Sequence, residues 1–256
     1  FLKVRGDRLG LPREVWGSIL LLALLNNALP FTLFGWGQTH IASGLASILN
    51  ATTPIWGVLV AHLFTEDERM TPRKVAGVLL GFGGVATMIG PTLLANVGTD
   101  ALAQLACIAA ALCYAVAAVW ARRFRRMGLS PMSVTTGQLT AGALMMLPVA
   151  MMVDQPWTQP LPPMTAWGAI VALALLCTAF GYVLYFKLID SAGATNALLV
   201  TLLVPPFAIL FGSLFLDEVL AAQDFAGLAL IALGLAAIDG RLLRKLRRSK
   251  PVTSPR

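Results

Sequence analysis

Long apolar segments separated by short polar connections dominate the chain. Each segment is close to the roughly 20 residues that a helix needs to cross a bilayer. The connections hold charged or proline-rich stretches such as Glu66–Lys74 and Asp154–Pro163, and they leave no room for a soluble domain. The pattern predicts eight transmembrane segments, at about 15–38, 41–65, 72–91, 100–121, 131–153, 165–187, 192–216 and 221–240.

These segments are expected to be helices, because a single segment in lipid must satisfy its own backbone hydrogen bonds. A membrane β-barrel would alternate apolar and polar positions, whereas these runs are continuously apolar. The composition agrees, since 57% of residues are hydrophobic and only 12% are charged. A soluble domain of 256 residues carries about twice that share of charge. The expected fold class is an all-α membrane protein, and a buried soluble bundle is the weaker alternative.

The basic residues fix an orientation for this topology. All 19 Lys and Arg residues fall before the first segment, in alternate connections, at the end of the sixth segment or after the eighth. The positive-inside rule therefore places both termini in the cytoplasm. We expect the membrane to be a bacterial inner membrane. The net charge of +7 does not indicate nucleic-acid binding, because the basic residues are scattered over helix ends. We expect 241–256 to be a basic cytoplasmic tail near anionic lipid.

The second half of the chain repeats the first at a distance of about 150 residues. Trp16-Gly17 aligns with Trp167-Gly168, and Pro54 with Pro205. After a one-residue slip, Gly77 and Gly84 align with Gly227 and Gly234. Aligned segments cross the membrane in opposite directions, so the halves are predicted to be inverted-topology repeats. Such repeats place a binding site near the bilayer midplane and supply two arrangements for alternating access.

The repeat predicts a unit of five helices. The segments 100–121 and 131–153 have no counterpart in the first half, and their partners would precede Phe1. We therefore expect an incomplete first unit over 1–91 and a complete second unit over 100–240. A chain that natively has eight helices is the alternative.

Two stretches carry a resemblance to a known family. The first is the run from Gly35 to Pro54, followed by Glu66-Asp67-Glu68-Arg69 and the glycine-rich segment 77–90. The second copy comprises 192–205, Asp217-Glu218 and the glycine-rich segment 227–234. Together they resemble the EamA-type transporters of the drug/metabolite transporter superfamily. The resemblance implies ten helices, cytoplasmic termini, and export or exchange of small metabolites such as amino acids.

A transport pathway needs polar side chains at membrane depth, where lipid-facing positions would penalise them. No Asp, Glu, Lys or Arg lies centrally in any segment, which favours a neutral, amphipathic or zwitterionic small-molecule substrate. The first half offers Asn26 and Asn27 shortly before Pro30. It also offers Asn50 and Thr53 on one helix face, Trp56 in mid-segment, and a predicted kink at Pro54.

The second half offers a matching set. Its predicted kinks are at Pro205 and Pro206, and breaks at matched positions in two repeats point to a binding site. Interhelical hydrogen bonding and simple packing are the alternatives for the polar residues. The candidate pathway residues are Tyr114, Gln138, Thr178, Tyr182, Tyr185, Asn196 and Thr201.

Other features add little chemistry. Trp16, Trp36, Trp120 and Trp167 lie near segment ends and read as an interfacial aromatic belt. The three cysteines lie in apolar segments without metal-ligand spacing, and no catalytic arrangement of Ser, His or paired carboxylates is visible. We expect no cofactor, no metal and no enzymatic activity. A secondary transporter, with homodimerisation possible, is the main hypothesis, and a non-transporting scaffold or assembly subunit is the alternative.

Overall fold

The computed structural model of the chain describes residues 13–41, 43–89, 100–158, 161–204, 206–207, 214 and 222–239. Over these residues, every regular element is a helix, so the predicted all-α class is confirmed. Four helices are long and apolar enough to cross a membrane: Arg13–Gln38, Ala101–Arg126, Pro131–Val153 and Met164–Ala192. They match four predicted segments closely, while the full count of eight stays a prediction.

The first half begins with a continuous helical rod that contains a π-helical segment. The segment 41–65 is interrupted, because Ala51 and Thr52 form a turn in its middle. The elements are α2 (Arg13–Ala23), η1 (Leu24–Ala28, π-helical), α3 (Leu29–Gln38), α4 (Ser43–Asn50), α5 (Thr53–Phe64) and α6 (Pro72–Ile89).

The second half contains a similar rod over 164–192, again with a π-helical segment inside it. Only the first part of the predicted segment 192–216 belongs to the described residues. The elements are α8 (Ala101–Arg126), α9 (Pro131–Val153), the short 3-10 helix η2 (Pro156–Thr158), α10 (Met164–Ala172), η3 (Leu173–Phe180, π-helical), α11 (Gly181–Ala192), α12 (Ala194–Leu198), η4 (Leu199–Leu203, 3-10) and α14 (Ala222–Asp239).

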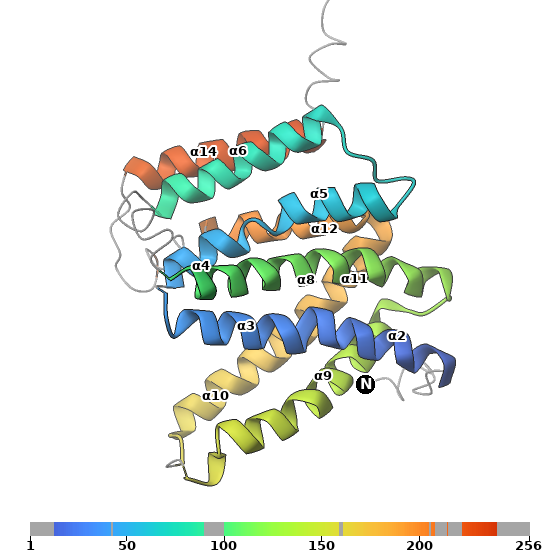
Figure 1. The fold of residues 1–256 in the computed structure, drawn as a ribbon, viewed down its shortest axis with the longest axis vertical. Coiled ribbons are helices and arrows are strands. Elements are labelled where there is room, and N and C mark those ends of the chain that lie inside the picture. The colour runs from blue at the N-terminus through green and yellow to red at the C-terminus, as the bar shows by residue number, and fades with distance from the viewer. Residues whose placement is uncertain are drawn as a thin grey trace, which may run out of the picture.

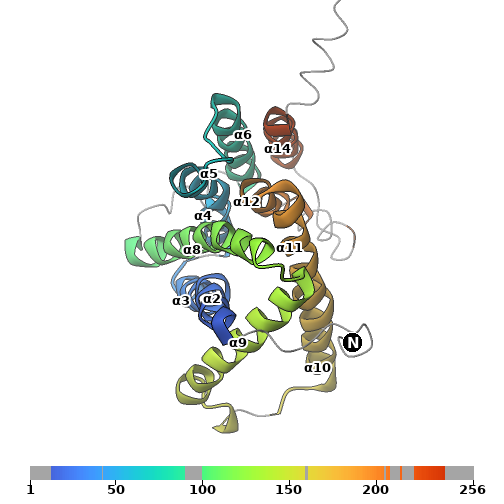
Figure 2. The ribbon, with the colours of Figure 1, turned by 90° about the vertical axis from the view of Figure 1, so that its right-hand side faces the viewer.

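The helices are stacked in layers (Figures 1 and 2). The pair α6 and α14 forms one edge, α5 and α12 lie side by side beneath it, and α8 crosses the middle. The rod of α2 and α3 follows, and α9 and α10 form the opposite edge. Small side chains along α8, such as Ala115, Ala118 and Ala121, are fully buried in the main apolar core and let neighbouring helices approach.

The α6–α14 contact is a backbone contact between glycines. A methyl group on Gly77 would lie 2.6 Å from the carbonyl oxygen of Gly234, and one on Gly84 would lie 2.6 Å from that of Gly227. Both helices have 18 residues and they start 150 positions apart. Gly77 aligns with Gly227 and Gly84 with Gly234, so the two contacts are exchanged between the halves. Small residues allow this approach in lipid, where packing drives helix association.

Candidate functional site

Four of the predicted pathway residues meet in one hydrogen-bonded ring. Asn26 Nδ2 donates to Gln138 Oε1 (3.3 Å), and Gln138 Nε2 donates to Asn27 Oδ1 (2.6 Å). Asn27 Nδ2 donates to the Tyr182 hydroxyl (3.2 Å), which donates to the Asn26 carbonyl oxygen (3.2 Å). We call Asn26, Asn27, Gln138 and Tyr182 the central polar cluster. It joins η1, α9 and α11, elements that are far apart in the sequence.

The local backbone explains how the cluster is buried. Asn26 and Asn27 lie in the π-helical η1 and are 3% and 5% exposed, and Gln138 on α9 is 0% exposed. Gly142, one turn after Gln138, makes room, because a methyl group there would lie 3.3 Å from the Asn27 Cβ. The neutral amides and hydroxyl satisfy one another, which removes the penalty of polar groups inside the membrane. The same donors and acceptors can be offered to a polar solute.

Aromatic rings adjoin this cluster. The Tyr182 ring packs edge-on to Tyr185 at 6.4 Å between centroids and stacks with Phe186 at 6.0 Å. Tyr114 on α8 stacks with Phe34 on α3 at 6.2 Å. Tyr185 and Trp56 pack against the same apolar core as Tyr182. Several of the predicted residues therefore lie together, although sequence reasoning could not say which would pair.

The polar residues of the first broken segment form a separate local group. Thr53 Oγ1 donates to the Asn50 carbonyl oxygen (2.6 Å), and Trp56 Nε1 donates to Thr52 Oγ1 (3.2 Å). The break lies at 51–52, before the predicted kink, and Pro54 stands in the first turn of α5, where its missing N–H is harmless. Thr52 was not among the predicted residues. Its position two residues before Pro54 was the one sequence feature that could have indicated a polar residue at the helix break.

The remaining candidates lie outside the cluster. Asn196 is exposed and donates to the Ala192 carbonyl oxygen (2.8 Å), and Thr201 donates to that of Leu198 (2.8 Å). Each of these side chains therefore bonds to the end of the preceding helix, α11 for Asn196 and α12 for Thr201. Thr178 is half-buried in η3, one turn before Tyr182. Pro206 is described and half-buried, whereas Pro205 lies outside the described residues.

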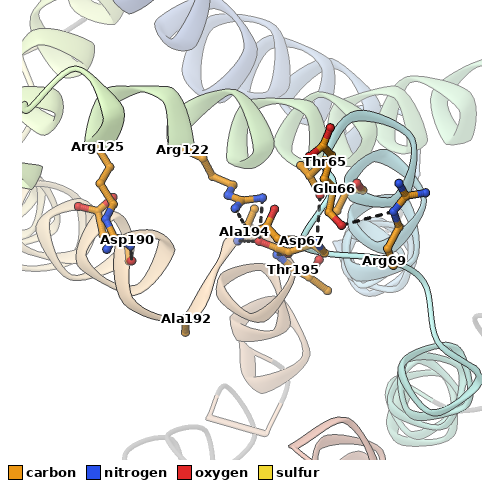
Figure 3. A network of polar contacts seen from close by, with 12 residues as sticks. Thr65, Glu66, Asp67, Arg69, Arg122, Arg125, Asp190, Ala192, Ala194 and Thr195 are labelled. Carbon is orange, nitrogen blue, oxygen red and sulfur yellow. Dashed lines mark hydrogen bonds and ion pairs between the residues drawn. The ribbon is translucent and has the colours of Figure 1, made fainter.

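A second polar site lies at the ends of α5, α8 and α11, and sequence reasoning missed it. Glu68 is only 9% exposed, and its two carboxylate oxygens accept from the backbone N–H groups of Ala194 and Thr195, both at 2.8 Å. Arg122 Nη1 lies 3.3 Å from Glu68 Oε1, and Arg122 also pairs with Asp67 (Figure 3). We call Glu68, Asp67, Arg122 and the backbone of 194–195 the Glu68 network.

The Glu68 network joins the two halves at the side that the predicted topology assigns to the cytoplasm. The Arg122 guanidinium lowers the pKa of the exposed Asp67 carboxyl by hydrogen bonding to it. Arg125 donates to the Asp190 carbonyl oxygen one helical turn along (Figure 3). A cavity of about 640 Å³ opens here, with Lys74, Arg122 and Asp190 among its lining residues. Charges of both signs therefore line this cavity, in contrast to the neutral central polar cluster.

Comparison with known proteins gives a consistent result. The model of the EamA-like transporter family matches residues 1–90 and 101–238. The uncharacterized transporter YoaV of Bacillus subtilis (strain 168) is 26% identical over 91% of this chain and 79% of its own. The probable terminal-alkyne amino-acid exporter of Streptantibioticus cattleyicolor is 28% identical over 84% of this chain and 70% of its own. One solved crystal structure is of a protein that is 20% identical to this chain. The two superpose with a TM-score of 0.75 over 92% of this chain and 80% of the other, which shows a shared fold.

Proposed function

Because this chain belongs to the EamA-like transporter family, of the drug/metabolite transporter type, we propose that it is a secondary transporter that exports or exchanges a small neutral or amphipathic metabolite. The chain is a multi-pass membrane protein with several apolar helices. The observation that carries the substrate class is the central polar cluster, whose four members are all uncharged, with three of them buried and Tyr182 half-buried. An amino acid or a drug-like molecule has the polar groups that such a cluster recognises. A relative named as an amino-acid exporter supports the same class.

The central polar cluster has the properties of a site that opens to admit a solute. Each of its hydrogen bonds is worth about 0.6 kcal/mol on average inside a membrane protein, so a bound substrate can replace them without a large penalty. Tyr182 supplies both a donor and an acceptor, and its ring adjoins Tyr185 and Phe186. Aromatic faces beside amide groups suit a substrate that is apolar at one end and polar at the other.

Alternating access by two inverted repeats, 1–91 and 100–240, fits several features of the fold. The exchanged glycine contacts between α6 and α14 are what a two-fold relation between the halves requires. The π-helical segments at 24–28 and 173–180 fall at aligned positions, and such segments occur frequently at functional sites. Both halves also interrupt a helix before an aligned proline, at 51–52 and at 199–203. Rocking of the halves would separate α9 and α11 from η1.

The direction of transport and the topology complete the proposal. The charged cavity beside the Glu68 network faces the cytoplasm in the predicted topology, which places the protein in a bacterial inner membrane with both termini in the cytoplasm. A charged vestibule can collect a zwitterionic solute and pass it to the neutral central polar cluster. This arrangement favours loading from the cytoplasm and export.

Reconstitution in liposomes tests the proposal. We would measure the flux of a panel of neutral amino acids and amphipathic drugs for the wild-type protein and for Asn27→Ala, Gln138→Leu and Trp56→Ala. Thr136→Ala is the matched control, because its hydroxyl bonds only to the Met132 carbonyl oxygen of its own helix in the described structure. Loss of about 1.4 kcal/mol of substrate binding lowers flux at limiting substrate roughly tenfold.

We expect flux of at least one panel member, with Asn27→Ala and Gln138→Leu reduced roughly tenfold and Thr136→Ala within about twofold of wild type. Unchanged flux in the first two variants would reject the site assignment. A panel that shows no flux at all, together with a stable complex with another membrane protein, would reject the transporter proposal in favour of the scaffold.

A further inference from the structure

A groove on the outside of the helix stack has apolar walls and a charged rim. It measures about 920 Å³ and lies between α2, α5 and α8. Its walls are apolar, with Leu21 from α2, Leu25 from η1, Val60 from α5, and Val116 and Val119 from α8. Among the described residues that line it, none belongs to the central polar cluster, so the groove is a separate site.

The rim of the groove is basic and lies at the cytoplasmic end of α8 in the predicted topology. Arg123 and Arg126 line it, together with Arg122, which is already engaged by Asp67 and Glu68. The Arg123 guanidinium lies 3.9 Å from the centroid of the Trp120 ring, so it is held at the mouth of the groove. Two carboxylates, Asp67 and Glu66, also line the rim. Arg122 is held by Asp67 and Glu68, which leaves Arg123 and Arg126 with the single carboxylate of Glu66 among the other charged rim residues, so this part of the rim is positive.

Trp120 connects the rim to the walls. Its Nε1 donates to the Ser18 carbonyl oxygen at 3.1 Å, which ties α8 to α2 beneath the groove. Tryptophan favours the boundary between lipid tails and headgroups, and its place near the end of a membrane segment fits that depth. The groove is thus apolar where acyl chains lie and positive where phosphates of the cytoplasmic leaflet lie.

We propose that this groove binds an anionic phospholipid of the cytoplasmic leaflet. An acyl chain lies along the walls formed by Leu21, Val60 and Val119, and the phosphate contacts Arg123 and Arg126. Basic pockets between membrane helices on the cytoplasmic side recognise anionic lipid headgroups in this way. Inorganic phosphate has the charge but would leave the apolar walls unfilled, so the lipid is the occupant that matches both parts of the groove.

The test is native mass spectrometry of the protein released from bilayers that contain equal amounts of phosphatidylglycerol and phosphatidylcholine. The wild-type protein should retain phosphatidylglycerol in excess, roughly fivefold for each guanidinium that contacts the headgroup. Arg123→Gln with Arg126→Gln should remove the excess. The control, Arg69→Gln with Arg73→Gln, removes the same charge from the same membrane face outside the groove and should keep it.

Two further arms separate the alternatives. Soluble glycerophosphoglycerol and inorganic phosphate should not displace the retained lipid, because they lack acyl chains. If the double groove variant fails to fold, the wild-type protein measured at high salt should lose its excess, since screening weakens the rim contacts. Equal retention of the two lipids by the wild-type protein, the same excess in both double variants, or displacement by inorganic phosphate would overturn the proposal.

Discussion

The carboxylate of Glu68 occupies the space that a side chain on Gly193 would need. A methyl group on Gly193 would lie 2.4 Å from Glu68 Oε1. Gly193 also has a φ of +88°, a backbone conformation that side chains disfavour. The turn between α11 and α12 therefore presents the N–H groups of Ala194 and Thr195 to a carboxylate that lies more than 120 residues earlier in the chain.

Gly193→Ala is expected to destabilise the protein by roughly 1–3 kcal/mol, because it adds backbone strain and displaces Glu68. A lower thermal unfolding midpoint in detergent would show the effect. Gly181→Ala is the control, since a methyl group on Gly181 of α11 meets no atom within 4 Å. Equal midpoints for the two variants would contradict the described contact.

Glu68→Gln should be more damaging than Asp67→Asn, although the residues are adjacent. Glu68 is buried and loses a charge-assisted hydrogen bond to the backbone, which is worth roughly 1.5–3 kcal/mol. The Asp67 side chain is 62% exposed, so its pair with Arg122 is worth about 1 kcal/mol or less. Chemical unfolding in mixed micelles measures the loss in free energy of unfolding for each of the two variants. A larger loss for Asp67→Asn would show that the exposed pair, and not the buried carboxylate, holds the network together.

The Asp67–Arg122 pair should make a small pH-dependent contribution. Arg122 lowers the pKa of Asp67 below its ordinary value of 3.8, so the pair stabilises the folded state above that pH. This stabilisation is lost as the pH falls through the lowered pKa. The difference in unfolding midpoint between the wild-type protein and Asp67→Asn should therefore be constant from pH 7 to about pH 5 and shrink below about pH 4. If the difference in unfolding midpoint instead grew as the pH fell, the pKa of Asp67 would be raised in the folded state and not lowered.

Gly84→Ala should separate α6 from α14, whereas Gly83→Ala should not. A methyl group on Gly84 would lie 2.6 Å from the Gly227 carbonyl oxygen, and backbone atoms cannot move away without shifting the helix. Overpacking of this kind costs roughly 1–3 kcal/mol. A methyl group on Gly83 meets nothing within 4 Å and improves helix propensity, so that variant should be neutral or slightly stabilised. Comparison of the two thermal midpoints is the measurement.

Tyr182→Phe should lower transport much more than it lowers the stability of the fold. The change removes two links of the hydrogen-bonded ring, to Asn27 and to the Asn26 carbonyl oxygen, and keeps the aromatic ring. Two such bonds are worth roughly 1 kcal/mol together inside a membrane protein, so the unfolding midpoint should fall only slightly. Flux in liposomes should fall roughly tenfold if the hydroxyl contacts substrate. A proportionate small loss in both measurements would make Tyr182 a packing residue.

The sequence predicted which residues belong to the central polar cluster but not which of them form hydrogen bonds with one another. Asn26, Asn27, Gln138 and Tyr182 are recognisable because polar side chains inside apolar segments must find partners. Their pairing depends on how η1, α9 and α11 cross, and no short-range pattern encodes that. Asn196 shows the opposite outcome: it has the same chemistry as Asn27, yet it bonds only four residues back, to the carbonyl oxygen at the end of α11.

The Glu68 network was missed for a different physical reason. Acidic and basic residues in a short connection between apolar helices are ordinary, and nothing local distinguishes Glu68 from Glu66 or Asp67. Its partners are backbone N–H groups at the start of α12, which have no side-chain signature. The glycine between α11 and α12 was the one available hint, because a glycine between two helices indicates a tight turn or a close neighbour.

The exchanged contacts between α6 and α14 make this surface self-complementary. Gly77 meets Gly234 and Gly84 meets Gly227, so interchanging the two helices would return the same pairs. Symmetric dimers are built from isologous surfaces of this kind. A single chain thus carries internally the type of contact that two identical subunits make. Two copies of α6 brought together in the same way would already hold glycines at both crossing points.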